Sequence, residues 1–84
     1  MSAGAFERLV DVMRRLRREC PWDKEQTHES IRYSLIEEAY EVVEAIDDKS
    51  LEELKNELGD LLLHVVFHTS IAEEKGEFTL EAVI

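Results

Sequence analysis

Two pairs of acidic residues constrain how this chain can fold. Glu38 and Glu41 form one pair and Glu57 and Asp60 the other, and each pair lies in a stretch whose apolar residues recur at helical spacing. Residues three apart share one face of a helix, so each pair points in a single direction. If the two helices pack side by side, four carboxylates converge on one small volume. We therefore expect an all-α fold built on an antiparallel helical hairpin with flanking helices.

Carboxylates held this close repel one another unless protons or cations neutralise them. Oxygen ligands in this number favour Mg²⁺ or Mn²⁺, and Mg²⁺ commonly binds together with a substrate phosphate. Acidic pairs at this spacing are also common on exposed helices, so a solvated acidic surface is the alternative interpretation.

Two histidines raise a rival hypothesis. His64 and His68 lie on the same predicted helix face as Glu57 and Asp60, as in a zinc or di-metal centre with mixed ligands. Glu57 and His68 are 11 positions apart, however, which is roughly 16 Å along a helix. One ion cannot bind all four side chains, so we expect both histidines to be interface or polar-core residues.

The composition excludes several classes of function. The 84 residues include 10 Lys and Arg against 20 Asp and Glu, a formal net charge of −10, which disfavours binding to a nucleic-acid polymer. The single cysteine, Cys20, allows no intramolecular disulfide. The first residues lack a secretory signal and no apolar run reaches the ~18 residues of a membrane span, so we expect a cytoplasmic protein without membrane contact.

Apolar spacing predicts a first helix over about residues 4–19, with its pattern interrupted at Pro21. A second helix is predicted over about residues 24–46. Asp23 is its expected N-cap, with Gln26 three residues later in a box-like start.

The third helix is predicted to span about residues 51–75. Ser50 and Glu53 form the capping-box pattern at its start, and Gly76 stops it. Thr79 is the expected N-cap of a last helix. Because the chain ends at Ile84, only a few residues into that helix, we expect residues 1–84 to form a single domain truncated at its C-terminal end.

The predicted core faces follow from the helical period. In the second helix the stripe comprises Leu35, Ala39, Val42 and Ile46, with Ile31 and Val43 flanking it. In the third helix it comprises Leu54, Leu58, Leu61, Leu62, Val65 and Ala72. From Leu61 to Ile71 this helix is apolar nearly all round, so it needs a second partner surface. We infer a homodimer or a higher oligomer.

Two features near the end of the first helix have alternative interpretations. Arg17 and Arg18 belong to a basic cluster, which either pairs with the acidic remainder of the chain or reaches a phosphate. Trp22 lies in the connection that follows. It either closes one end of the small core or offers a flat face to a nucleobase.

The acidic patches and this connection together resemble a known family. The run Cys20-Pro21-Trp22-Asp23-Lys24-Glu25-Gln26-Thr27, followed by Glu37-Glu38-Ala39-Tyr40-Glu41 and then Glu57-Leu58-Gly59-Asp60-Leu61-Leu62, is similar to the MazG family. That family consists of all-α nucleoside triphosphate pyrophosphohydrolases. Its signature, Glu-Glu-x-x-Glu followed after a spacer by Glu-x-x-Asp, is matched completely. The resemblance covers about residues 5–84.

The resemblance implies Mg²⁺-dependent hydrolysis of a nucleoside triphosphate to a nucleoside monophosphate and pyrophosphate, in a helical dimer with active sites near the subunit interface. The matching positions imply that the metal ligands are Glu38, Glu41, Glu57 and Asp60. One of Glu37, Glu38 and Glu41 would accept the proton of the attacking water. Candidate substrate contacts are Arg17, Arg18 and Lys24 for phosphate and Trp22 for the base.

An alternative function remains open within the same resemblance. MazG proteins commonly carry two such domains, and their chains continue with a further helix and basic residues that help to hold the substrate. The present chain could therefore be a non-catalytic dimerisation or nucleotide-sensing module of a larger protein.

Overall fold

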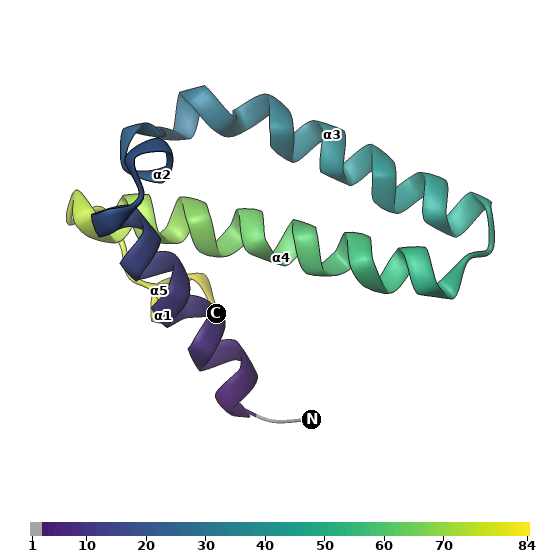
Figure 1. Ribbon diagram of the computed structural model, residues 1–84, viewed down its shortest axis with the longest axis horizontal. Helices are drawn as coiled ribbons and strands as arrows, with labels where there is room; N and C mark the ends of the chain where they lie inside the picture. Colours follow the sequence, from purple (N-terminus) through teal and green to yellow (C-terminus); the bar gives the residue numbers. More distant parts are fainter. Residues whose placement is uncertain (1–2) are drawn as a thin grey trace.

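The computed structural model describes residues 3–84, and this part of the chain is entirely helical apart from short connections (Figure 1). The helices are α1 (Ala3–Glu19), α2 (Pro21–Glu25), α3 (His28–Asp47), α4 (Leu51–Glu74) and α5 (Leu80–Val83). The predicted all-α class is confirmed. None of these helices combines the length and apolar character that a membrane span requires.

The two long helices, α3 and α4, form an antiparallel hairpin, as predicted (Figure 1). Helix α1 packs across α4 near the end of the hairpin that is remote from its turn, and α2 connects α1 to α3. The core lies where α1 meets the hairpin. Its buried residues are Val10, Met13, Ile31, Val66, Phe67 and Ile71, with Phe6, Leu9 and Leu80 packed against them.

The start of the second predicted helix is corrected by the structure. Residues 21–25 form the separate short helix α2, and α3 begins at His28 rather than at Lys24. Thr27 is the N-cap, and it forms a complete capping box with Ser30. Asp23 is therefore not the cap, and its carboxylate is free of this backbone role.

The other predicted helix ends agree with the structure. The Ser50 hydroxyl accepts a hydrogen bond from the Glu53 N–H at 3.2 Å, and Thr79 caps α5 in the same way through the Ala82 N–H. The Ser50 N–H donates to the carbonyl of Ala45 instead of to Glu53, so only half of the predicted box forms. Gly76 follows α4 with φ +69°, a left-handed conformation that glycine adopts without strain.

The predicted core stripes are partly wrong within the single chain. In α3 the buried residues are Ile31, Glu38 and Ala45, whereas Ala39 and Ile46 are exposed. The buried stripe is therefore rotated by about one position, and Glu38 lies in it rather than at its border. In α4, Ala72 is buried, but three residues of the predicted stripe are exposed, namely Leu58, Leu62 and Val65. The α4 residues that pack with α1 in the core are Val66, Phe67 and Ile71.

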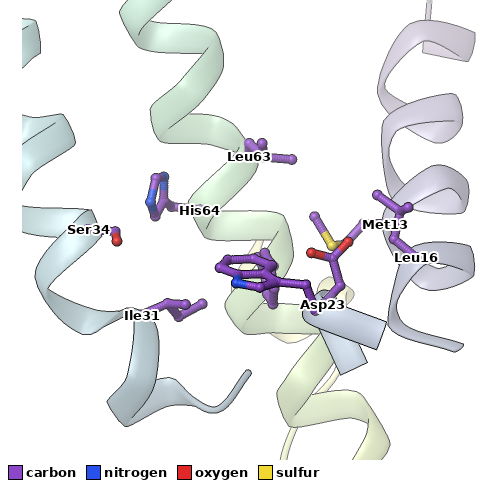
Figure 2. Close-up of a pocket in the computed structure, with 9 residues that line it drawn as sticks. Met13, Leu16, Asp23, Ile31, Ser34, Leu63 and His64 are labelled. Carbon is purple, nitrogen blue, oxygen red and sulfur yellow. The ribbon is translucent and has the colours of Figure 1, made fainter. Parts of the chain in front are cut away.

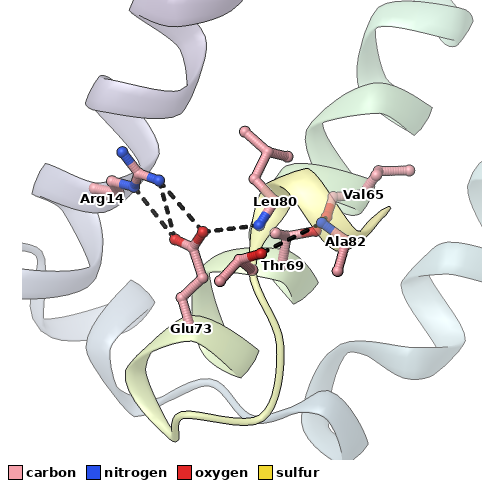
Figure 3. Close-up of polar contacts among 7 residues, drawn as sticks. Arg14, Val65, Thr69, Glu73, Leu80 and Ala82 are labelled. Carbon is pink, nitrogen blue, oxygen red and sulfur yellow. Dashed lines mark hydrogen bonds and ion pairs between the residues drawn. The ribbon is translucent and has the colours of Figure 1, made fainter. Parts of the chain in front are cut away.

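One carboxylate joins α1, α4 and the chain that leads into α5. Glu73 accepts hydrogen bonds from the Arg14 guanidinium at 3.1 and 3.3 Å and from the Leu80 N–H at 2.9 Å (Figure 3). The side chains are partly buried, with 44% of Arg14 and 23% of Glu73 exposed. A bidentate guanidinium pair fixes geometry better than a single contact does.

We expect Glu73→Ala to lower the free energy of unfolding by about 1–2 kcal/mol, because it removes both the ion pair and the acceptor of the Leu80 N–H. Chemical denaturation followed by circular dichroism measures this. Glu44→Ala is the control, since Glu44 is an exposed glutamate inside α3. An equal effect of the two substitutions would show that the Glu73 contacts contribute nothing to stability.

A pair of stacked imidazoles joins the first residue of α3 to α4. The Nδ1 atoms of His28 and His68 are 2.8 Å apart, and the rings are nearly parallel with centroids 5.0 Å apart. One nitrogen must donate and the other accept, so at least one ring is neutral. Burial lowers the pKa of His68, and the positive charges of His28 and His64 lower it further. Protonation of His68 is therefore disfavoured in the folded chain.

This lowered pKa predicts a pH-dependent stability. Because the pKa of His68 is lower in the folded chain than the ordinary 6.5, the unfolded chain takes up the proton first, and stability falls as the pH drops below about 6.5. We expect wild type to lose more unfolding free energy between pH 7.5 and pH 5.5 than His68→Gln does. The carboxylates titrate in both proteins and cancel in this comparison. Equal losses would contradict the assignment.

Candidate functional site

The structure brings three of the predicted ligands together between the helices of the hairpin. Glu38 and Glu41 come from α3 and Glu57 from α4, and one carboxylate oxygen of each lies within 4.8 Å of the others. Helical spacing explains the arrangement, because residues three apart on α3 point toward the same face of α4. We call these three residues the carboxylate cluster.

Glu38 is the most buried member of the cluster. It is only 8% exposed, and its Oε2 atom is buried without a hydrogen-bond partner in the described chain. A buried carboxylate oxygen without a partner is costly. A cation bound at Glu38 would give this oxygen the partner that it lacks.

The carboxylates of the cluster raise one another's pKa. The pKa of Glu41 is raised, first by the negative charge of Glu57 and then by desolvation, with a smaller contribution from Asp60. The pKa of Glu57 is raised first by a hydrogen bond with the Glu38 carboxyl group, then by desolvation and by the charges of Glu38 and Asp60. Like charges at this separation favour neutral carboxyl groups or a bound cation.

The donor set fits a hard divalent cation. Three carboxylates that converge from two rigid helices offer oxygen ligands alone, the type that Mg²⁺ and Mn²⁺ prefer. The unpartnered oxygen of Glu38 and the mutual rise in pKa are what such a site shows when its charge is not neutralised. The residues present therefore fit the predicted metal.

The remaining acids of the two patches lie beside the cluster. Asp60 is exposed and is not one of the three gathered residues, but its charge acts on both Glu41 and Glu57. Glu37 is exposed and is also outside the three. Their roles as a fourth ligand and as a base stay predictions.

A cavity of about 290 Å³ lies between the helices, one helical turn along the hairpin from the cluster. It is lined by Met13, Leu16, Trp22, Asp23, Ile31, Ser34, Leu63, His64 and Phe67. Figure 2 shows α1, α2, α3 and α4 each contributing to its wall. Ser34 lies one helical turn before Glu38 and His64 one turn after Asp60, so the cavity begins about 6 Å along the hairpin from the carboxylates.

The predicted substrate contacts lie in different surroundings in the structure. Trp22 lines the cavity, is 61% exposed, and packs edge-on against Phe67 with the ring centroids 6.5 Å apart. Lys24 is exposed on α2 and Arg18 on α1, and neither forms an ion pair with another described residue. All three stay predictions as contacts to a nucleotide.

Arg17 already has several partners inside the chain. Its side chain is only 8% exposed, and its guanidinium pairs with Glu74 at 2.7 Å. It also donates hydrogen bonds to the backbone carbonyls of Asp23 and of Gln26. The hydrogen bond with Glu74 raises the pKa of Arg17. Arg17 thus fixes the connection between α1 and α3 and thereby positions the cavity wall; the predicted phosphate contact stays untested.

The histidines are not gathered with the acids. His64 donates from Nδ1 to the carbonyl of Asp60 at 2.9 Å, and His68 pairs with His28. Neither belongs to the cluster, so the described geometry gives the zinc hypothesis no common ligand set.

Sequence reasoning did not find Asp23, Ser34 or His64 as cavity residues. The sequence pattern predicts His64 as an interface or polar-core residue, with a metal ligand as the alternative, and predicts Asp23 as an N-cap. A charged residue directly beside the single tryptophan was the signal available in the sequence.

Comparison with known proteins agrees with this geometry. Residues 26–84 match the family model described as the MazG nucleotide pyrophosphohydrolase domain. The chain is 57% identical over 81 residues to the nucleoside triphosphate pyrophosphohydrolase/pyrophosphatase MazG of Thermotoga maritima, covering 94% of this chain and 32% of that protein. It is 48% identical over 76 residues to the nucleoside triphosphate pyrophosphohydrolase of Escherichia coli K12, covering 87% of this chain and 29% of the relative.

A solved structure shares the fold. The crystal structure of a MazG-related protein from Thermotoga maritima aligns with a TM-score of 0.82 at 31% identity, covering 92% of this chain and 68% of that one. The chain spans about a third of the length of the curated relatives named above. The family match extends over most of the sequence and includes both acidic patches, and the chain therefore belongs to the MazG nucleotide pyrophosphohydrolase family.

Proposed function

We propose that this chain is a nucleoside triphosphate pyrophosphohydrolase domain that binds Mg²⁺ through Glu38, Glu41, Glu57 and Asp60. The observation that carries the proposal is the convergence of the carboxylate cluster in a chain of the MazG family. The reaction releases pyrophosphate and leaves a nucleoside monophosphate. Mn²⁺, which accepts the same oxygen ligands, is the expected substitute.

The glutamates of the site have different proposed roles. Glu38, with its buried unpartnered oxygen, holds the cation deepest between the helices, while Glu41 and Glu57 complete the cluster from the two sides. Bound Mg²⁺ would neutralise charge at the phosphates and lower the pKa of a bound water. A carboxylate among Glu37, Glu38 and Glu41 would accept the proton of the attacking water.

In this proposal the nucleoside part of the substrate occupies the cavity near the carboxylate cluster. Its wall is largely apolar, with a few polar side chains, which is the usual composition of a small-molecule site. Trp22 provides an aromatic surface against which a nucleobase can stack, and such stacking accepts any base. The triphosphate then extends past Ser34 and His64 toward the carboxylates. Lys24 lies on α2 with Trp22, and Arg18 lies beside Glu73 and Glu74, so in this arrangement the predicted phosphate contacts are at the nucleoside end and the bound cation would hold the outer phosphates.

Homodimerisation is part of the proposal. Apolar side chains at helical spacing stay exposed on α4, with 48% of Leu58, 41% of Leu62 and 40% of Val65 exposed, and others on α3. A contiguous apolar surface of this kind favours a protein partner. A second copy of the chain is the expected one.

We expect Glu57→Gln to raise the melting temperature of the chain in EDTA, because it relieves like-charge repulsion in the cluster. The same variant should lose the increase in melting temperature that Mg²⁺ gives the wild type, because a ligand that binds the folded state stabilises it. Glu44→Gln is the control, since Glu44 is exposed on α3 outside the cluster. A normal Mg²⁺ response in Glu57→Gln would remove this residue from the site.

Glu38→Gln should lower the rate of pyrophosphate release from nucleoside triphosphates by on the order of 100-fold or more, since it removes one charged group from the reacting centre. An assay for pyrophosphate in the presence of Mg²⁺ measures this. Unchanged turnover in the variant would exclude Glu38. Tight nucleotide binding by the wild type without any release would instead favour the nucleotide-sensing alternative.

The dimer predicts a concentration-dependent mass. We expect the wild type to sediment at twice the mass of the chain and Leu62→Lys to sediment as a monomer, because a charge would be buried without a partner at the interface. Leu51→Lys is the control, since Leu51 is 79% exposed at the start of α4. A wild type that is monomeric throughout the micromolar range would contradict the prediction.

A further inference from the structure

One guanidinium joins three helices next to the cavity. Arg17 on α1 has a side chain that is only 8% exposed. Its guanidinium forms a bidentate pair with Glu74 on α4, at 2.7 and 2.9 Å, and donates to the backbone carbonyls of Asp23 and Gln26. Most of its N–H donors are therefore already used. Because Arg17 is not among the described residues that line the cavity, any effect on a ligand there has to pass through its neighbours.

The two carbonyls that Arg17 binds lie at the end of α2. This helix spans only Pro21–Glu25, and Gln26 is its C-cap. A helix this short is marginal by itself, and the last carbonyls of a helix lack partners within it. The guanidinium supplies donors to this end, together with a positive charge that suits it. Arg17 thereby fixes the orientation of the helix that carries Trp22.

A second route joins Arg17 to Trp22 through an aromatic ring. The guanidinium carbon of Arg17 lies 5.9 Å from the centroid of the Phe67 ring, within the range of a cation–π contact. The Trp22 ring packs against Phe67 at an interplanar angle of 84°, one of the preferred arrangements of aromatic pairs. Both aromatic residues line the cavity. The same cation thus supports the backbone of α2 and the ring on which the Trp22 side chain packs.

We propose that Arg17 is a positioning residue for nucleotide binding, which holds Trp22 in the orientation that accepts a nucleobase. The inference rests on the proposed function, because it takes Trp22 as the surface on which the base stacks. Trp22 is 61% exposed, so packing on Phe67 fixes only part of a ring that has to stay open to a ligand. A ring ordered in advance loses less entropy when the ligand binds.

Lysine cannot replace arginine in this role. An ammonium group is a compact charge without the planar fork of a guanidinium. It cannot pair with Glu74 in a bidentate way and also reach the carbonyls of Asp23 and Gln26. Arg17→Lys therefore keeps the positive charge of α1 and removes the connection between α2, α4 and the aromatic pair.

Arg17→Lys is tested with the α,β-methylene triphosphate of adenosine in Mg²⁺, with calorimetry as the measure of affinity. We expect the affinity to fall about tenfold, because the stacking surface loses its fixed orientation. The fluorescence anisotropy of Trp22, the single tryptophan, should fall in the protein without nucleotide. The rise in melting temperature with Mg²⁺ should be kept, because Arg17 lies outside the carboxylate cluster.

Arg14→Lys is the matched control. Arg14 lies one turn earlier on α1 and pairs with Glu73, the residue before Glu74, through both carboxylate oxygens. Within the described chain, its side chain forms no hydrogen bond with α2 and no cation–π contact. We expect this variant to bind the analogue with the affinity of the wild type and to keep the Trp22 anisotropy. Far-UV circular dichroism checks the fold of each variant.

A double-mutant cycle separates positioning from direct contact. In a Trp22→Leu background, Arg17→Lys should cause no further loss of affinity, because there is no tryptophan left to position. Additive losses would show that Arg17 acts on the nucleotide independently of Trp22, as a phosphate contact does, and would overturn the inference. Where Arg17→Lys does not fold, Glu74→Gln weakens the hold on the same guanidinium from a side chain that is 46% exposed, and it should lower affinity and anisotropy in the same direction.

Unchanged affinity in Arg17→Lys would also overturn the inference, as would equal losses in Arg17→Lys and Arg14→Lys or loss of the Mg²⁺ response. These outcomes leave the proposed function standing, since pyrophosphate release by the wild type tests it separately. Nucleotide binding that depends on Arg17 but leads to no release would overturn the proposed function alone. Absence of nucleotide binding by the wild type would overturn both.

Discussion

The crowding of negative charge between α3 and α4 is the constraint on which the rest of the molecule depends. Glu38, Glu41 and Glu57 bring their oxygens within 4.8 Å of one another, and the pKa values of Glu41 and Glu57 are raised as a result. The core therefore lies elsewhere, at the junction of α1 with the far half of α4, where apolar packing supports the hairpin. The stabilising apolar contacts thus lie away from the crowded carboxylates.

The sequence was sufficient for the parts of the site that depend on local geometry. Spacing of three on a helix places Glu38 and Glu41 on one face whatever the rest of the chain does, and one short turn returns α4 alongside α3. The antiparallel hairpin and the gathering of carboxylates could therefore be predicted. The caps at Ser50 and Thr79 were predictable for the same reason, since each bonds within its own first turn.

The parts that were missed depend on competition or on distant contacts. Asp23 and Thr27 were both chemically able to cap the second long helix, and the reciprocal bonds between Thr27 and Ser30 decided between them. The face that α4 turns toward α1 is set by packing on Met13 and Val10, which no periodicity within α4 reveals. The basic cluster that contains Arg17 was expected to pair with acidic residues or to reach a phosphate, but its partner Glu74, 57 positions away, could not be identified from spacing.

The connection held by Arg17 separates two parts of the site in the sequence. The family match begins at Gln26, after the residues of α1 and α2 that form one wall of the cavity, while the carboxylate cluster lies wholly within the matched hairpin. The other wall of the cavity comes from the hairpin itself, through Ile31, Ser34, Leu63, His64 and Phe67. A substitution in α1 or α2 can therefore reshape the cavity and leave the carboxylates in place, whereas a shift of α3 against α4 alters both at once.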